Sequence, residues 1–168
     1  LMFRDWDDAD RVRERLRPDL EARLLAAGYV VLFWGDGGWV RYFSSKPIQR
    51  VHDLKSLRVY ASSGDPQSVE LMKAYYTPVV LEPDQILLGL RNGMIDALPV
   101  PAFLANFNQV ATYAPYMLDL NWAPITGALV VSEKAWKQLD PATQAWLRET
   151  SERAGVEMRR AARAEDQA

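Results

Sequence analysis

The sequence predicts an α/β fold, in which a sheet of parallel or mixed strands packs against helices. The continuous apolar, β-branched run at 29–34 is typical of a buried strand, and 57–62, 78–83 and 125–132 also read as strands. Stretches with helical signals separate these runs, and such alternation is the pattern of an α/β domain. No internal repeat or low-complexity segment interrupts the pattern.

The first helix is predicted to begin near Asp7 and Asp8, because carboxylates suit the N-terminus of a helix. Apolar residues then recur every fourth position, as one helix face requires: Val12, Leu16, Leu20 and Leu24. Pro18 interrupts this face and is expected to kink or split the helix, since proline has no backbone N–H to donate. Gly28 is a suitable stop.

A glycine-rich stretch, WGDGGWVRYFSSKP at 34–47, follows the first strand and contains a second predicted strand at 39–43. A dinucleotide-binding turn needs G-x-G-x-x-G before a helix, and a P-loop needs a Lys-Ser/Thr pair; this stretch has neither. Two interpretations remain. The glycines relieve backbone strain in a turn, or a strand crosses here between two lobes and its side chains line a cleft.

The remaining elements alternate to the end of the chain. Residues 46–56 read as a loop with a short turn, and 94–101 as a short strand running into prolines. Asp140-Pro141 is a strong helix start, since proline suits the first helical position. The predicted helices lie at 66–76, 84–93, 102–118, around Trp136 and from 141 to about 165.

The composition excludes several classes of function. The 168 residues carry a net charge of −2, which argues against a nucleic-acid-binding protein that works by charge alone. Without cysteine there is no disulfide, zinc-thiolate site or cysteine nucleophile. Six Trp and seven Tyr are more than a core of this size usually needs, so some rings are expected to face a ligand.

Catalytic signals are weak. The one histidine, His52, lies in a polar loop, and no G-x-S-x-G motif accompanies it. The aspartates at 36, 65, 84 and 96 match no metal-binding loop. We therefore predict no enzyme, no catalytic residue, no cofactor and no metal site. The rival reading is a small α/β enzyme that uses Asp36 or Asp65 as a base.

Two further stretches are candidates for ligand binding. Ser62, Ser63 and Asp65 fall between a strand and a helix, where open α/β sheets place ligands. Free N–H groups there favour an acceptor or an anion, although simple helix capping explains the same residues. Trp122 precedes a strand, and its ring is predicted to face either a ligand or the core.

Three passages resemble the substrate-binding proteins of TRAP (tripartite ATP-independent periplasmic) transporters. They are FSSKPIQRVHDLKSLRVY at 43–60, LEPDQILLGLRNGMIDAL at 81–98 and LVVSEKAWKQLDPATQAWL at 129–147. Each motif alone is modest, but their order and spacing agree with the family. The resemblance implies a type II periplasmic binding protein, with two lobes, mixed sheets and crossing hinge strands, which closes on a solute and is then recognised by a membrane permease.

The resemblance also implies an organisation for the chain. Family members are roughly twice as long, so the chain resembles their second half, with the N-terminal half absent. Residues 1–33 would end the N-terminal lobe with a helix and hinge strand, 34–98 would form the C-terminal lobe, and 99–168 would cross back with lobe-spanning helices and a strand. We expect a periplasmic location, a signal peptide upstream, no nucleic-acid partner, and self-association of the fragment through exposed lobe surfaces. A cytoplasmic ligand-sensing domain of similar architecture stays open.

One position departs from the family pattern. Most members have an arginine that pairs with the ligand's carboxylate where this chain has Tyr60, and a subgroup with an aromatic residue there is associated with more apolar ligands. Either Arg41 or Arg58 is a candidate to replace the missing arginine. The solute is therefore expected to be an organic acid or a more apolar molecule. The expected ligand-binding residues, with Tyr60 first, are Tyr60, Trp34, Asp36, Trp39, Ser62, Asp65, Pro101, Phe103 and Trp122.

Overall fold

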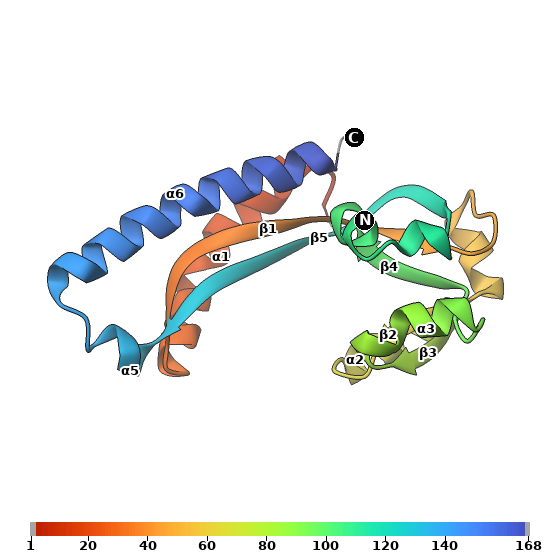
Figure 1. Ribbon diagram of the computed structural model, residues 1–168, viewed down its shortest axis with the longest axis horizontal. Coiled ribbons are helices and arrows are strands. Elements are labelled where there is room, and N and C mark those ends of the chain that lie inside the picture. The colour runs from red at the N-terminus through yellow and green to blue at the C-terminus, as the bar shows by residue number, and fades with distance from the viewer. Residues whose placement is uncertain (1–2, 167–168) are drawn as a thin grey trace. The chain divides into compact units, whose positions relative to one another are not determined.

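The protein contains a five-stranded mixed sheet with the strand order β3-β2-β4-β1-β5 (Figure 1). The computed structural model describes residues 3–166. Strand β2 runs parallel to β3 and β4, whereas β1 runs antiparallel to β4. The α/β prediction is thus confirmed. The strands are β1 (Tyr29–Ser44), β2 (Arg58–Ser62), β3 (Thr77–Leu81), β4 (Ala97–Pro101) and β5 (Tyr116–Ser132).

The two long helices begin after aspartates that bind their first free N–H groups. Asp5 accepts a hydrogen bond from Asp8 N, and Asp140 accepts from the backbone of the last helix just before Pro141. The α-helices are α1 (Trp6–Ala26), α2 (Pro66–Met72), α3 (Ile86–Arg91), α4 (Ala102–Phe107), α5 (Glu133–Trp136) and α6 (Pro141–Glu165). Short 3-10 turns lie at Val51–Ser56, Pro83–Gln85 and Val110–Thr112.

The chain divides into two compact units. Unit 1 consists of Leu1–Gly38 and Ala123–Ala168, and unit 2 of Trp39–Trp122. Strands β1 and β5 each belong to both units, because the boundaries fall inside them. The assignment of 1–33, 34–98 and 99–168 to parts of a two-lobed protein stays a prediction.

The glycine-rich stretch is part of a strand and not a turn. Strand β1 is continuous over 16 residues, so the two predicted strands and the glycines between them form one element. A Cβ on Gly37 would come within 3.0 Å of the Ile125 side chain of β5, and Gly38 has a φ of 86°. Glycine is thus needed for close approach and for a left-handed backbone. The interpretation as a turn is wrong.

Two helix predictions are also corrected. Pro18 lies inside α1 without splitting it. The helix predicted over 102–118 ends at Phe107, and Gln109 then adopts a left-handed φ of 54°. Phe103 and Phe107 lie in α4, whereas Tyr113 is the C-cap of the 3-10 turn Val110–Thr112. Strand β5 begins at Tyr116 and not near residue 125.

Unit 2 has a hydrophobic cluster on each face of its sheet. The first, cluster A, contains Phe43, Leu81, Leu90, Ile95, Leu98, Ala105, Val110 and Ala114. The second, cluster B, contains Tyr42, Ile48, Leu54, Leu57, Val59, Ala97 and Leu118. Neighbouring positions on β1 and β4 alternate between the two clusters, as strand geometry requires. Unit 2 therefore buries both faces of its sheet.

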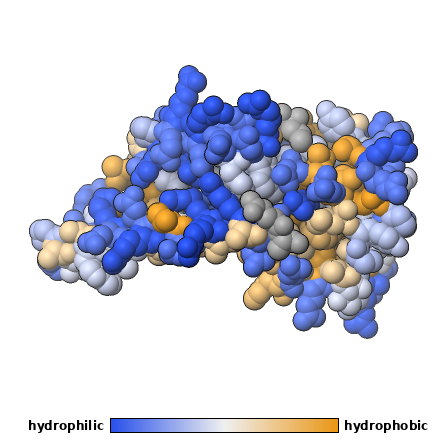
Figure 2. Space-filling model, turned by 90° about the horizontal axis from the view of Figure 1, so that it is seen from above, coloured by the Kyte–Doolittle hydropathy of each residue, from blue (hydrophilic) through white to orange (hydrophobic). Residues whose placement is uncertain are grey.

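In unit 1 the helices α1 and α6 pack against β1. Gly155 of α6 lies directly on Phe33, because a Cβ there would come within 2.6 Å of the phenylalanine ring. Hydrophilic residues dominate the half of the surface that α6 occupies (Figure 2). No helix within residues 3–166 has the length and apolarity to cross a membrane.

Candidate functional site

The residues predicted to bind a ligand lie in three places. Trp34 and Asp36 belong to a polar network in unit 1. Tyr60 and Ser62 lie on the cluster A face of unit 2, whereas Trp122 lies on the opposite face. Each group has its own local contacts within its unit.

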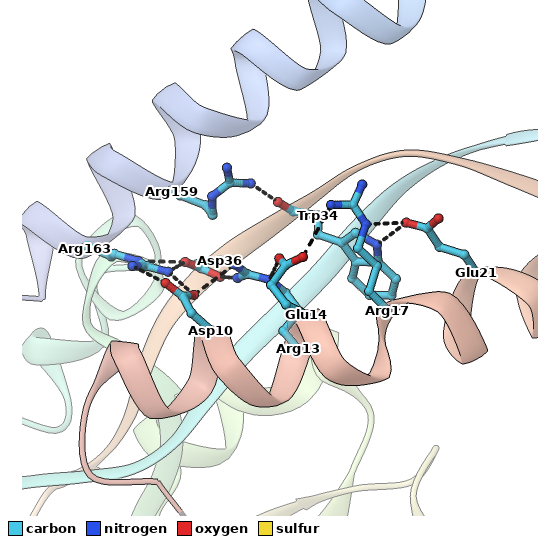
Figure 3. A network of polar contacts seen from close by, with 9 residues as sticks. All are labelled: Asp10, Arg13, Glu14, Arg17, Glu21, Trp34, Asp36, Arg159 and Arg163. Carbon is cyan, nitrogen blue, oxygen red and sulfur yellow. Dashed lines mark hydrogen bonds and ion pairs between the residues drawn. The ribbon is translucent and has the colours of Figure 1, made fainter.

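Asp36 is the centre of the network in unit 1 (Figure 3). Its carboxylate has 0% exposure and accepts hydrogen bonds from Arg13 Nη1 at 2.9 Å and from Arg163 Nη2 at 2.6 Å. Asp10 binds both arginines, at 2.9 Å from Arg13 and 2.6 Å from Arg163. Two carboxylates and two guanidinium groups therefore compensate one another where α1, β1 and α6 meet.

Trp34 extends the same network along β1. Its Nε1 donates to Glu21 Oε1 of α1 at 2.9 Å, and Arg17 Nε binds the same oxygen at 2.8 Å. The Trp34 carbonyl accepts a hydrogen bond from Arg159 of α6. Within unit 1, the polar atoms of Trp34 and Asp36 thus hold α1 and α6 onto β1. Both residues therefore have a structural role that does not depend on a ligand.

The cluster A face of unit 2 carries the tyrosine that replaces the family's arginine. Tyr60 is half-buried and packs against cluster A. Because side chains alternate along β2, Ser62 points to the same face as Tyr60. Arg41 lies opposite Val100 on the neighbouring strands, and Val100 also packs against cluster A. Tyr60, Ser62 and Arg41 therefore share one face of the sheet.

Arg58 is engaged in a tight ion pair. Its Nε and Nη2 donate to the two oxygens of Asp96 at 2.9 and 3.0 Å, and its backbone N donates to Asp96 at 3.0 Å. Lys46 Nζ lies 2.9 Å from the same carboxylate, which is 5% exposed. Hydrogen bonding from Arg58 holds the pKa of Asp96 well below its usual range, against the opposing effect of burial. Arg58 therefore has a structural partner.

Arg41 contacts residues of β5. Its Nε donates to Asn121 Oδ1 at 3.3 Å, and its Nη1 lies 3.8 Å from Asp119, whose side chain is 91% exposed. A solvated carboxylate at that distance is a weak partner. The Arg41 side chain is nonetheless 16% exposed and held on the sheet.

The opposite face of unit 2 carries a shallow aromatic pocket of about 420 Å³. The edge of Trp122 meets buried Tyr42, with ring centroids 5.6 Å apart, and the Tyr42 hydroxyl lies 2.8 Å from the Tyr76 hydroxyl. Burial, followed by the bond to Tyr76, raises the pKa of Tyr42 far above its usual value, so the pair stays neutral. The pocket is lined by Ser68, Leu71, Met72, Tyr75, Tyr76 and Trp122.

The other predicted residues have local roles. Trp39 and Pro101 are buried, and Pro101 precedes α4, on which Phe103 is half-buried. The Asp65 carboxylate accepts from Ser68 N at 3.0 Å and so caps α2 itself. Ser62 Oγ accepts from Gly64 N at 3.2 Å. Capping thus accounts for these loop contacts, and whether any of the residues binds a ligand stays a prediction.

Sequence reasoning missed most of the pocket. Tyr75 and Tyr76 follow α2, which ends at Met72, whereas the sequence predicted a helix through residue 76. Tyr42 was read only as part of a strand. Within residues 3–166 no group of three His, Cys, Asp or Glu side chains is placed to hold a metal ion.

A family model described as bacterial extracellular solute-binding protein, family 7 (DctP), matches residues 1–168. Among curated proteins, the uncharacterized protein YiiZ of Salmonella typhimurium is 28% identical over 143 residues. The match covers 82% of this chain but 42% of YiiZ. The chain therefore spans less than half of that relative's length.

Solved structures share the fold at low identity. A TRAP periplasmic solute binding protein from Ralstonia eutropha, with bound (S)-2-acetolactate, has a TM-score of 0.91 at 20% identity, covering 100% of this chain and 55% of that one. A galactonate complex of a sugar acid binding protein from Advenella mimigardefordensis has 0.89 at 16%, covering 99% and 55%. A solute receptor from Bordetella pertussis that binds pyroglutamic acid has 0.85 at 20%, covering 97% and 54%. The predicted binding-protein fold is confirmed, over about half of each neighbour.

Proposed function

This chain belongs to the bacterial extracellular solute-binding protein family 7, and on that premise we propose that it is part of the solute-binding component of a TRAP-type transporter. The family match over residues 1–168 is the observation that carries the proposal. It agrees with the resemblance of three sequence motifs to the same class of protein. The chain spans about half of its structural neighbours, so the function proposed is that of the whole protein.

The proposed mechanism is non-covalent capture. Two lobes of the whole protein close around a small solute by hinge motion, and the closed form delivers the solute to permease subunits in the membrane. Support comes from β1 and β5, which both pass from one compact unit into the other. The proposal includes a periplasmic location and no catalytic role.

The acidic group of an organic-acid solute is proposed to pair with Arg41 and not with Arg58. A planar guanidinium suits a carboxylate because its two N–H groups match the two oxygens. Arg58 already makes that contact with Asp96, whose side chain is 5% exposed. Removing Arg58 from Asp96 would leave a buried charge poorly compensated. Arg41 shares the Tyr60 face, and its contacts include a hydrogen bond to Asn121 at 3.3 Å and an ion pair at 3.8 Å with Asp119, whose side chain is 91% exposed.

The test is a thermal-shift screen of the whole protein against pyroglutamate, acetolactate, galactonate and neutral small molecules. A ligand at 100 times its Kd should stabilise the native state by about 2.7 kcal/mol, which is readily seen as a rise in Tm. Arg41→Gln should abolish the rise caused by an acidic solute, whereas the matched Arg50→Gln, in an exposed loop, should leave it intact. A protein that binds none of these molecules, and carries no small molecule in native mass spectrometry, would contradict the proposal.

A further inference from the structure

We infer that the aromatic pocket of unit 2, lined by residues of α2 and by Trp122, binds an uncharged apolar chain or ring of the solute. This inference rests on the proposed function, because it assigns a part of the ligand to a part of the protein. Three observations support it: the chemistry of the lining residues, the fixed orientation of the rings, and the position of the pocket where β5 leaves unit 2.

The lining contains no ionisable group that is charged at neutral pH. Three aromatic rings, Leu71, Met72 and the hydroxyl of Ser68 form the surface. The charged side chains at the end of α2, Glu70 and Lys73, pair with each other. A carboxylate or ammonium group in the pocket would lose hydration without gaining an opposite charge. An apolar group would be favoured there because it removes both its own surface and exposed aromatic surface from water.

The rings are held in place before any ligand arrives. Trp122 meets Tyr42 at an interplanar angle of 76°, and Tyr76 meets it at 71°. Tyr42 itself is 0% exposed, and its hydroxyl is bonded to that of Tyr76. Ligand binding therefore does not need to immobilise these rings, and the smaller loss of side-chain entropy favours binding. Met72 lines the same pocket, and a flexible thioether side chain adapts to irregular apolar groups.

The exposure of the pocket residues also requires an explanation. Trp122, Leu71 and Tyr75 are 41%, 69% and 63% exposed, although buried Tyr42 lies beneath the pocket. The volume of about 420 Å³ is within the range of small-molecule sites, roughly 300–1,000 Å³. Trp122 is also the last residue of unit 2 before the chain passes into unit 1, so the pocket lies where β5 leaves the unit. The exposure, the volume and the position of the pocket are those of a small-molecule site and not of an incompletely packed hydrophobic core.

The inference predicts how affinity depends on the apolar length of the ligand. We would titrate the whole protein with the straight-chain alcohols from 1-propanol to 1-octanol and follow binding by calorimetry. Affinity should rise by about fourfold for each methylene until the pocket is filled, because each buried methylene is favourable by that factor. Trp122→Ala should flatten this dependence. Trp146→Ala, which removes a 60% exposed tryptophan from α6, should leave it unchanged.

The outcomes separate the inference from the function on which it rests. Tight binding of pyroglutamate or galactonate that Trp122→Ala does not weaken, together with no dependence on chain length, would overturn the inference while leaving a solute-binding protein. Failure of every probe, polar or apolar, in a protein shown to be folded by circular dichroism would remove both. A chain-length dependence that survives in Trp122→Ala would place the apolar group elsewhere and would also overturn the inference.

Discussion

The polar network around Asp36 makes a quantitative prediction for stability. Asp36→Ala leaves Arg13 and Arg163, with side chains 9% and 25% exposed, to share the carboxylate of Asp10. The exposed Glu14 also lies 3.4 Å from Arg13. Breaking a buried ion pair by removing one partner costs about 3–5 kcal/mol, since a buried charge is left uncompensated. Asp10 keeps contacts to both arginines, so we expect the lower end, about 3 kcal/mol of unfolding free energy.

Urea unfolding followed by far-UV circular dichroism measures this loss. The matched control is Asp19→Ala, which removes the partner of Arg23 on α1 from a pair whose side chains are 59% and 76% exposed. Such a surface pair contributes about 0–1 kcal/mol, so the control should unfold almost as the wild type does. Equal losses for the two variants, or a loss below about 0.5 kcal/mol for Asp36→Ala, would refute the reasoning that burial makes this network important.

Three further predictions concern packing, a buried hydroxyl pair and pH. Gly155→Ala should cost about 1–3 kcal/mol of unfolding free energy, because the new Cβ would come within 2.6 Å of the Phe33 ring. The control Gly127→Ala, where a Cβ would meet no atom within 4 Å, should cost less than about 1 kcal/mol. Equal urea midpoints for the two variants would contradict this prediction. Tyr42→Phe leaves the Tyr76 hydroxyl without its partner and should lower the unfolding free energy by about 1–2 kcal/mol, and an unchanged value would show that water replaces the bond. The pKa of Asp96 is lowered in the folded state, so its carboxylate stabilises the fold above the unfolded-state pKa of about 3.9, and this stabilisation is lost as the pH falls below that value. In a profile of urea midpoint against pH, Asp96→Asn should therefore show a smaller decrease than the wild type between about pH 5 and 2. Parallel profiles for the two proteins would refute this assignment.

Local signals in the sequence were sufficient for several elements. Asp140-Pro141 predicts the start of α6 because both the cap and the fixed proline φ act within one turn. The runs at 57–62 and 78–83 predict β2 and β3 because β-branched residues favour extended backbone within a short segment. In these cases the residues that determine the structure are close neighbours in the chain.

Other features depend on partners that are distant in sequence. The glycines at 35–38 form a strand because β5 lies beside them, and β5 is more than 80 residues away. Arg163, which binds Asp36, lies 127 residues from it. No local pattern distinguishes an aspartate that will meet a ligand from one that will meet two arginines.

The candidate site shows the same limit. Tyr60 and Trp122 were both predicted to bind the ligand, and both are partly accessible. The strand register places them on opposite faces of the sheet, with clusters A and B between them. Register is set by strand pairing over the whole sheet, and a shift of one residue would exchange the faces. Residue type alone therefore identified candidate ligand-binding residues but could not show which of them lie on the same face of the sheet.

The most direct test of the account is a structure of the whole protein with the solute that it carries. We expect a small molecule whose apolar chain or ring contacts Trp122 and Tyr76. Trp122→Ala should then release that solute during purification. A solute bound without contact to Trp122 or Tyr76, or one that places a carboxylate in the aromatic pocket, would contradict the account.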